Sequence, residues 1–399
     1  MKSLMTVSLI LCSFLVQSQA VWEEMAPCPA AGRFWAAATG NSTHGYCGTG
    51  RLQFAGLNNQ VSDMYAYELA SDTWTQISDY PGGVREGMTG FTIGERIFFA
   101  FGSPFIQFTK TIYEYLPESN TWNQMPDVPG IGFAFSEGFV IDDTFYIGPE
   151  NGTNTVYTFN ASTNTWGTAA SFPGNDRRHQ CTFTANGKGY LGMGAGVFGG
   201  VYGDWWEYDP IADSWNEIAS MSPHADQACA TAVSNTGYLY NTGGGGFGGQ
   251  NLYSYNAEAN EWVFESTKPD DRVANSAAMT IGDQGFVVFG EESTTEGNFP
   301  ANKLWRFSPN TSAIGEYYDN SIQLNVIYTS QGVVIRSQKE IQENGLFELY
   351  TIGGQLVYQR ALQAGSPLNI QLNSDLPGGI YTARCVLGSA ISAIQVFYQ

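Results

Sequence analysis

The sequence predicts an all-β protein whose main part is a six-bladed β-propeller, closed by its N-terminal strand and followed by a small Ig-like β-sandwich. The 399-residue chain holds 47 Gly together with 22 Tyr, 25 Phe and 10 Trp. This composition favours short strands joined by tight turns. No stretch keeps helical periodicity over several turns. Landmarks that recur every 46 to 49 residues indicate repeated four-stranded units.

The first landmark is a pair of aromatic residues two positions apart, with a Trp seven residues after the second aromatic. The five complete copies end at Tyr67 and Trp74, Tyr115 and Trp122, Phe159 and Trp166, Tyr208 and Trp215, and Tyr255 and Trp262. Side chains at i and i+2 project from one face of a strand. The residues between are rich in Asn, Asp, Ser and Thr, which favours a hairpin turn. Each copy therefore predicts two neighbouring antiparallel strands.

Two more landmarks run in phase with the first. Apolar strands end at Gly56, Gly102, Gly148, Gly194, Gly243 and Gly290, and each Trp segment ends near a Pro at 29, 81, 129, 173, 223 or 269. Two further apolar runs precede each aromatic pair, so each period supplies four strands. One such sheet cannot bury both faces by itself, and neighbouring sheets must stack. Four strands in a period of this length indicate a propeller blade.

The last copy of the pattern is incomplete. The pair Trp305 and Phe307 is followed by Ile314 where a Trp is expected, while Trp22 precedes every pair. The strand of Trp22 is therefore predicted to complete the last blade. In this interpretation Trp22, Trp74, Trp122, Trp166, Trp215 and Trp262 are structural residues of the repeat.

The unit of an apolar strand ending in Gly, an aromatic pair, a "YDP"-like turn and a Trp resembles the kelch repeat over residues 22–310. The resemblance implies a kelch-type propeller, to which residues 21–315 are assigned. The double Gly of the family is clear only in "GGGG" of the fifth unit. The departure leaves the kelch subfamily open.

The N-terminus predicts export. Residues 1–20 combine Lys2, a short apolar run and the Ser18-Gln19-Ala20 cleavage pattern of a signal peptide. No later stretch is long and apolar enough for a membrane span. The net charge of −20 excludes nucleic acid as an expected partner, because phosphate binding needs clustered basic residues. Cys181 and Cys229, expected on neighbouring innermost strands, are interpreted as buried small hydrophobes, with a disulfide as the alternative.

After a linker at 316–321, residues 322–399 show their own alternating strands, which predict a small antiparallel β-sandwich. The segments "LFELYTIGGQLVYQ" and "LPGGIYTARC" resemble the C-terminal sorting domain of the type IX secretion system. The resemblance implies that this tail engages the secretion machinery and that the protein is secreted or displayed on the outer-membrane surface. An ordinary Ig-like accessory domain is the alternative.

The candidate ligand site lies in loops at one end of the propeller. Basic residues recur in the loops that enter the innermost strands, and aromatic residues occur in the partner loops. The candidates are Arg33, Arg85, Arg177, Arg178, His224, Arg272, Phe105, Phe198 and Phe247. This combination favours a glycan or protein ligand. Arginines that only seal the scaffold are the alternative interpretation.

Enzymatic activity has little support in the sequence. No nucleophile elbow, P-loop or zinc-protease motif occurs, and no cofactor or metal is expected, with only three His. A kelch-fold sugar-acid epimerase or mutarotase, similar to sialic-acid epimerases, is the alternative function. In that case Glu291 or Glu292 beside the arginines would serve as the base.

Overall fold

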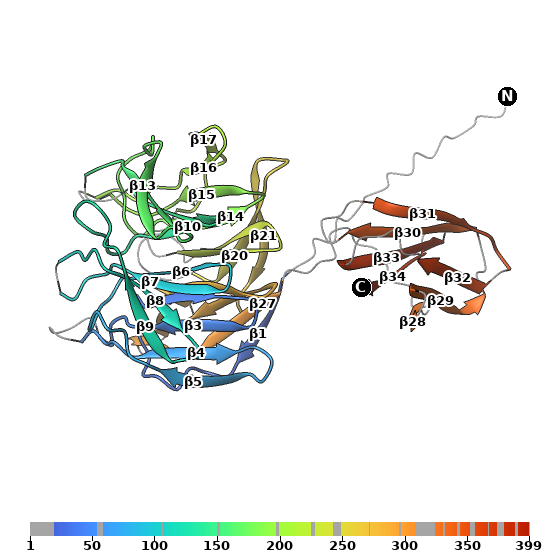
Figure 1. The fold of residues 1–399 in the computed structure, drawn as a ribbon, viewed down its shortest axis with the longest axis horizontal. Helices are drawn as coiled ribbons and strands as arrows, with labels where there is room; N and C mark the ends of the chain where they lie inside the picture. The colour runs from blue at the N-terminus through green and yellow to red at the C-terminus, as the bar shows by residue number, and fades with distance from the viewer. Residues whose placement is uncertain are drawn as a thin grey trace, which may run out of the picture. The chain divides into compact units, whose positions relative to one another are not determined.

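The computed structural model describes residues 20–398 apart from the segments 54–58, 106, 150–151, 197–198, 225–227, 242–248, 271, 295–296, 309–323, 330–331, 341–343, 352–355, 366, 373–378 and 388–389. The chain divides into two compact units, Gln19–Asn310 and a C-terminal unit from Thr311 (Figure 1). Every regular element in the described ranges is a β-strand. No helix among them is long and apolar enough to cross a membrane.

Six antiparallel sheets of four strands make up most of the described part of the first unit. They are β2(Ala37–Gly40) β3(His44–Gly48) β4(Met64–Glu68) β5(Thr73–Ile77); β6(Thr89–Ile93) β7(Arg96–Ala100) β8(Ile112–Leu116) β9(Thr121–Met125); β10(Gly138–Ile141) β11(Thr144–Ile147) β12(Val156–Asn160) β13(Thr165–Ala169); β14(Cys181–Ala185) β15(Lys188–Gly192) β16(Trp205–Asp209) β17(Ser214–Ile218); β18(Cys229–Val233) β19(Thr236–Asn241) β20(Asn251–Asn256) β21(Glu261–Thr267); and β23(Ala277–Ile281) β24(Gln284–Val288) β27(Leu304–Ser308) β1(Val21–Met25).

The first strands of these sheets contact one another in cyclic order. β2 contacts β6, β6 contacts β10, and the series continues through β14, β18 and β23 back to β2. In sheets one to five, consecutive strands pair as a meander, and sheet six has the order β23, β24, β27 and β1, so the first-listed strand of each sheet is innermost. Repeated four-stranded sheets arranged in this way form a β-propeller. We refer to the sheets by number, from sheet one (β2–β5) to sheet six (β23, β24, β27 and β1).

The N-terminal strand β1 completes sheet six. It pairs antiparallel with β27, and Trp22 lies opposite Phe307. The other sheets repeat this pairing, as Tyr67 opposite Trp74 shows. The ring centroids are 5.4 Å apart for Trp22 and Phe307 and 5.0 Å apart for Tyr67 and Trp74. The aromatic pattern thus places the outer two strands of each sheet in register.

Each of these Trp side chains also reaches an adjacent sheet. The Nε1 of Trp74 donates to the Ala26 carbonyl at 2.7 Å, and that of Trp215 donates to the Ala170 carbonyl at 3.0 Å. Trp22 donates instead to the Ser266 hydroxyl at 2.9 Å. Each Trp therefore satisfies its indole N–H in the adjacent sheet, while its half-buried ring packs against the aromatic residue opposite it in its own sheet.

The glycine landmark is shifted in the first sheet. Gly102, Gly194 and Gly290 all have positive φ, and each is the second residue after the end of the second strand of its sheet. In sheet one the equivalent conformation is at Gly50, with φ of 92°, whereas Gly56 lies outside the described residues. A side chain at Gly50 would also approach the Phe34 carbonyl oxygen to 2.9 Å. The sequence spacing favoured Gly56 because the loop after β3 is longer than the loops after β7, β11, β15 and β19.

Sheet six carries an inserted hairpin. Strands β25(Glu291–Thr294) and β26(Gly297–Pro300) lie between β24 and β27 in the chain, and β22(Arg272–Ala274) pairs with β25. Together they form a separate three-stranded sheet. The insertion belongs to the same loops that connect second and third strands in the other sheets.

The C-terminal unit contains two antiparallel sheets in its described ranges. One holds β28(Leu324–Thr329), β29(Gly332–Glu340) and β32(Pro367–Leu372), and the other holds β31(Leu356–Leu362), β30(Gly345–Thr351), β33(Gly379–Leu387) and β34(Ala390–Tyr398). Buried side chains come from both sheets, with Ile335 and Ile370 from the first and Phe347, Leu349 and Cys385 from the second.

Candidate functional site

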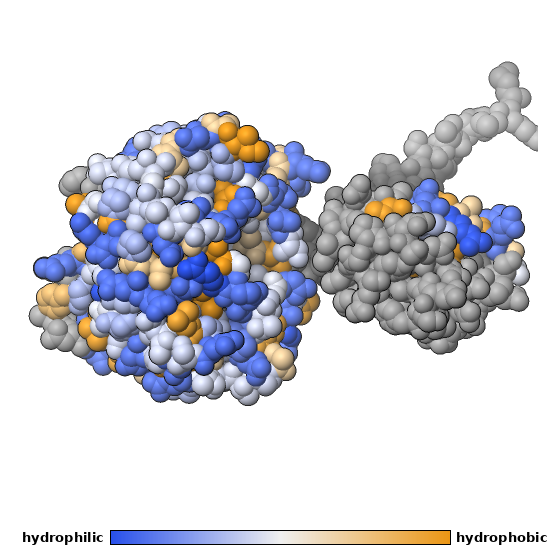
Figure 2. Space-filling view, in the orientation of Figure 1, coloured by the Kyte–Doolittle hydropathy of each residue, from blue (hydrophilic) through white to orange (hydrophobic). Residues whose placement is uncertain are grey.

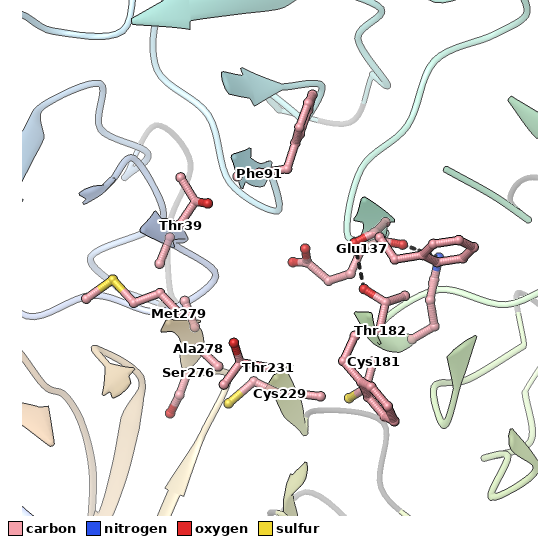
Figure 3. Close-up of a pocket in the computed structure, with 18 of the residues that line it drawn as sticks. Thr39, Phe91, Glu137, Cys181, Thr182, Cys229, Thr231, Ser276, Ala278 and Met279 are labelled. Atoms are coloured by element: carbon pink, nitrogen blue, oxygen red, sulfur yellow. Dashed lines mark hydrogen bonds between the residues drawn. The ribbon is translucent and has the colours of Figure 1, made fainter. Parts of the chain in front are cut away.

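A cavity of about 350 Å³ lies inside the ring of innermost strands. Its lining comes from β2, β6, β10, β14, β18 and β23 and from the residues just before them (Figure 3). We call the end at which the chain enters these strands the loop end. The opposite end, where tight turns join first to second strands, is the hairpin end. A concave space inside a rigid ring is the usual position for a ligand.

A chain of backbone hydrogen bonds runs around the cavity at the loop end. Trp35 N–H donates to Asn275 at 3.2 Å, Gly87 to Trp35 at 2.9 Å, Phe135 to Gly87 at 2.8 Å, and His179 to Phe135 at 2.6 Å. All five residues have positive φ, between 55° and 61°. This conformation is unusual for residues other than Gly, and its recurrence in neighbouring sheets shows that the ring imposes it.

Three aromatic side chains from this chain of hydrogen bonds cross the cavity at the loop end. The ring centroids of Trp35 and Phe135 are 5.2 Å apart, and those of Phe135 and His179 are 5.1 Å apart. Trp35 and His179 belong to opposite sheets, one and four, yet their rings are only 6.4 Å apart. Gly87 makes this possible, because a Cβ there would lie 2.5 Å from the Phe135 ring.

Glu137 brings a carboxyl group into the cavity (Figure 3). It follows Phe135 by two residues, and the corresponding positions two residues after Trp35, Gly87, His179 and Asn275 hold Ala37, Thr89, Cys181 and Ala277. The side chain is exposed by surface area, but it opens into the central cavity, where the surrounding strands limit its contact with bulk water. Burial raises the pKa of Glu137 to about 8. The carboxyl group can therefore exchange a proton near neutral pH.

Threonine hydroxyls line much of the remaining wall. Thr182 donates to the Gly138 carbonyl at 2.7 Å and Thr184 donates to the Val140 carbonyl at 2.6 Å. Thr280 donates to Ala232 at 2.7 Å, so Thr231, 2.6 Å away, must donate to Thr280. These hydroxyl hydrogens are used within the protein, and the oxygens keep lone pairs that can accept hydrogen bonds.

Cys181 and Cys229 also line the cavity. Both thiols are free and buried, as the sequence interpretation expected. Burial raises the pKa of each thiol, so the thiolate is disfavoured. They serve as small apolar side chains in the wall.

Three of the predicted arginines are buried in the scaffold. Arg33 and Arg177 each form a bidentate ion pair, with Asp63 at 2.7 and 2.9 Å and with Asp204 at 2.7 Å for both bonds. Arg85 donates to the Phe101 carbonyl at 2.9 Å. Each guanidinium donates to the residue that precedes the positive-φ glycine of its sheet. These arginines thus hold the loops, and direct ligand contact by them stays a prediction.

The other predicted site residues are distributed as follows. Arg178 is half-buried and its backbone bridges to Ala195, while His224 is exposed. Phe105 is 40% exposed. The backbone of Arg272 lies in β22, but its side chain, with Phe198 and Phe247, lies outside the described residues.

Apolar side chains are exposed around the loop end. Nine large hydrophobic residues are exposed among the described ones, and five of them lie at this end: Val84, Phe105, Ile131 and Val201 in loops, and Phe299 in β26 of the inserted hairpin. The loops are tied to one another by bridges such as Val61 to Arg85 and Thr109 to Phe133. On the side of the propeller that Figure 2 shows, hydrophobic residues form separate small patches on a largely polar surface.

The fold and the cavity define the chain as a β-propeller with a lined central cavity. Among solved structures it is similar to that of YjhT, with a TM-score of 0.58 and 15% sequence identity over 70% of this chain and 95% of that chain. At this identity the likeness supports the propeller fold alone. No family model matches the sequence, and no curated protein matches it.

The sequence interpretation missed Glu137 and the three aromatic residues. A repeat pattern highlights residues that recur in every unit, whereas Glu137 is a charged residue at a position that is uncharged elsewhere in the ring. Aligning the residues that enter the innermost strands would have revealed this exception. The contacts of Trp35 with Phe135 and His179 join three different sheets, so no local spacing could indicate them.

Proposed function

We propose that this protein is a secreted or surface-displayed binding module, a kelch-type six-bladed propeller that holds a glycan or protein ligand at its loop end. The observation that supports this most is the concentration of exposed apolar side chains in the loops there. Apolar side chains gathered at one end of an otherwise polar protein offer a surface for an interaction. Phe105 and Phe299 offer aromatic surface for a sugar ring or an apolar side chain.

The buried arginines support this function indirectly. Arg33, Arg85 and Arg177 connect loop backbone to strand ends through hydrogen bonds of 2.7 to 3.2 Å. Loops held in this way lose little conformational freedom when they bind a ligand. In this proposal the guanidiniums preorganise the surface and the apolar side chains contact the ligand.

A substitution pair tests this surface. The double variant Phe105→Ser/Phe299→Ser should weaken binding by at least about tenfold in a glycan array and in pull-down from culture medium, because two apolar anchors are lost. Ile211→Ser is the matched control, since Ile211 is 96% exposed in a turn at the hairpin end. Unchanged binding in the double variant, or equal loss in the control, would contradict the assignment.

Export forms the second part of the proposal. Residues 1–20 act as the signal peptide, and residues 322–399 act as a type IX sorting domain of Ig-like sandwich form. The support is the separate compact C-terminal unit with its two antiparallel sheets. Deletion of 322–399 should retain the propeller in the periplasm, as detected by cell fractionation. Normal surface delivery of the truncated protein would contradict this role.

The epimerase alternative receives less support from the geometry. Glu291 is buried and Glu292 forms an ion pair with Lys303 at 2.9 Å. The arginines that would bind a sugar carboxylate make their hydrogen bonds to Asp63, Asp204 and backbone carbonyls. A direct test is NMR observation of sialic-acid anomer interconversion with and without the protein.

A further inference from the structure

The two ends of the central cavity differ in their side chains. At the loop end the rings of Trp35, Phe135 and His179 cross the space. At the hairpin end the lining residues are small: Gly40, Thr92, Val140, Thr184, Ala232 and Thr280. A small molecule is therefore expected to enter from the hairpin end and to meet Glu137 and the aromatic rings at the far end.

The charges around the hairpin end are acidic. The turns that follow the innermost strands carry Glu95, Asp142, Asp143 and Asp283. Three basic residues stand next to the turns that follow the innermost strands: His44, which contacts the Thr43 hydroxyl, and Arg96 and Lys188, each of which is paired with a carboxylate of its own sheet. Arg96 bonds Glu114 at 2.6 Å and Lys188 bonds Glu207 at 2.6 Å. Such a surface raises the local concentration of cations and repels anions.

The inner wall of the cavity also favours a cation. Thr182, Thr184 and Thr280 donate their hydroxyl hydrogens to backbone carbonyls, so their hydroxyl oxygens can only accept hydrogen bonds from a ligand. A ligand rich in donors matches such a wall, and an ammonium group carries three donors. Aromatic rings attract a cation over their faces.

We propose that the cavity binds the ammonium group of a small organic cation, which enters from the hairpin end and pairs with the carboxylate of Glu137 as that group releases its proton to solvent. The rings of Trp35 and Phe135 supply the π surface at the closed end. One carboxylate suits an organic ammonium better than Ca²⁺ or Mg²⁺, which take six or more oxygen ligands. The site is distinct from the apolar surface at the loop end and does not depend on it.

Calorimetric titration with two amines tests the proposal. Glucosamine and the slimmer putrescine serve as probes, and N-acetylglucosamine is the uncharged match. At least one of the two amines should bind, and its affinity should fall at high salt. If glucosamine binds, N-acetylglucosamine should bind at least about tenfold more weakly than glucosamine. Glu137→Gln should reduce amine affinity by about tenfold or more, because it keeps the shape and removes the counter-charge.

Two control variants locate the site. Glu95→Gln removes one exposed carboxylate at the hairpin end and should change affinity less than about threefold, since salt screens exposed charges. Phe105→Ser/Phe299→Ser should leave amine binding unchanged. Absence of binding by both amines, an unaltered affinity in Glu137→Gln, or loss of amine binding in the Phe105/Phe299 variant would overturn the proposal. Thermal unfolding of Glu137→Gln at mildly acidic pH should match the wild type and so exclude misfolding.

Discussion

Asp204 and Glu137, in adjacent sheets of the propeller, have pKa values that are shifted in opposite directions. Partial burial tends to raise the pKa of Asp204, but hydrogen bonds from Arg177 and Trp206 outweigh it and hold the pKa below its usual range. Burial raises the pKa of Glu137 to about 8, with no described cation beside it. The comparison separates carboxylates that belong to the scaffold from a carboxyl that faces the cavity.

Asp63 in sheet one behaves in the same way as Asp204. Burial alone would raise the pKa of Asp63, but hydrogen bonds from Arg33 lower that pKa below its usual value. In sheet two, Arg85 has no carboxylate partner and bonds the hydroxyls of Thr109 and Thr111 at 2.7 Å. A buried arginine is thus present in sheets one, two and four, whereas a carboxylate partner is present only in sheets one and four among these three.

Removal of the scaffold cation should have the largest effect. Arg177→Ala leaves Asp204 and the Met193 carbonyl without their donor, and we expect a loss of about 3 kcal/mol in the free energy of unfolding. Lys188→Met is the control, because Lys188 is 36% exposed and exposed ion pairs contribute only about 0–1 kcal/mol. Urea titration measures both. Similar losses in the two variants would contradict the distinction between buried and exposed pairs.

Removal of the cavity carboxyl should have an intermediate effect that depends on pH. The pKa of Glu137 is raised in the folded state to about 8, above its value of about 4.5 in an unfolded chain. Its contribution to stability is therefore complete below about pH 4.5 and is lost as pH rises through about 8.

Glu137→Gln should accordingly flatten this part of the stability profile. We expect a gain of about 1 kcal/mol over wild type at pH 9 and none at pH 5, discounted from the full shift because water reaches the carboxyl. Thermal unfolding at the two pH values measures the difference. An equal difference between the proteins at both pH values would show that Glu137 does not titrate in this range.

The smallest pH-dependent effect is expected in acid, apart from the loss of stability that follows when buried Arg33 and Arg177 lack their counter-charges. The pKa of Asp63 and of Asp204 is depressed in the folded state, so their contribution is present above the unfolded pKa of about 3.8 and is lost as pH falls through the folded pKa. Both side chains are about a quarter exposed, which limits the effect. Asp63→Asn/Asp204→Asn should be less stable than wild type at pH 6 and should approach it near pH 2, as followed by circular dichroism.

Much of the fold was predictable because its rules are local. The spacing of Tyr208 and Trp215 sets a hairpin in register, and each repeat carries the same signal. The incomplete copy at Phe307 pointed to Trp22, which lies opposite it. These inferences need only strand periodicity and turn chemistry.

The site was less predictable because its contacts cross the ring. Arginines in the entering loops suggested a basic surface, yet Arg33 and Arg177 turn inward to carbonyls and carboxylates that only the folded loops bring together. Whether a charged side chain faces solvent or scaffold depends on partners in other loops. The apolar loop residues were visible only as isolated letters until the fold placed them at one end.

The pairing of β1 with β27 also sets an order of events in folding. Glu23 and Arg306, which are joined across this pair, stand 283 positions apart. Bringing such distant segments together is slow, and sheet six cannot acquire its outer strand until the residues of β27 are available. Strand β1, the first strand of the propeller, is therefore expected to dock last. The ring can then close only after the residues of all six sheets are available.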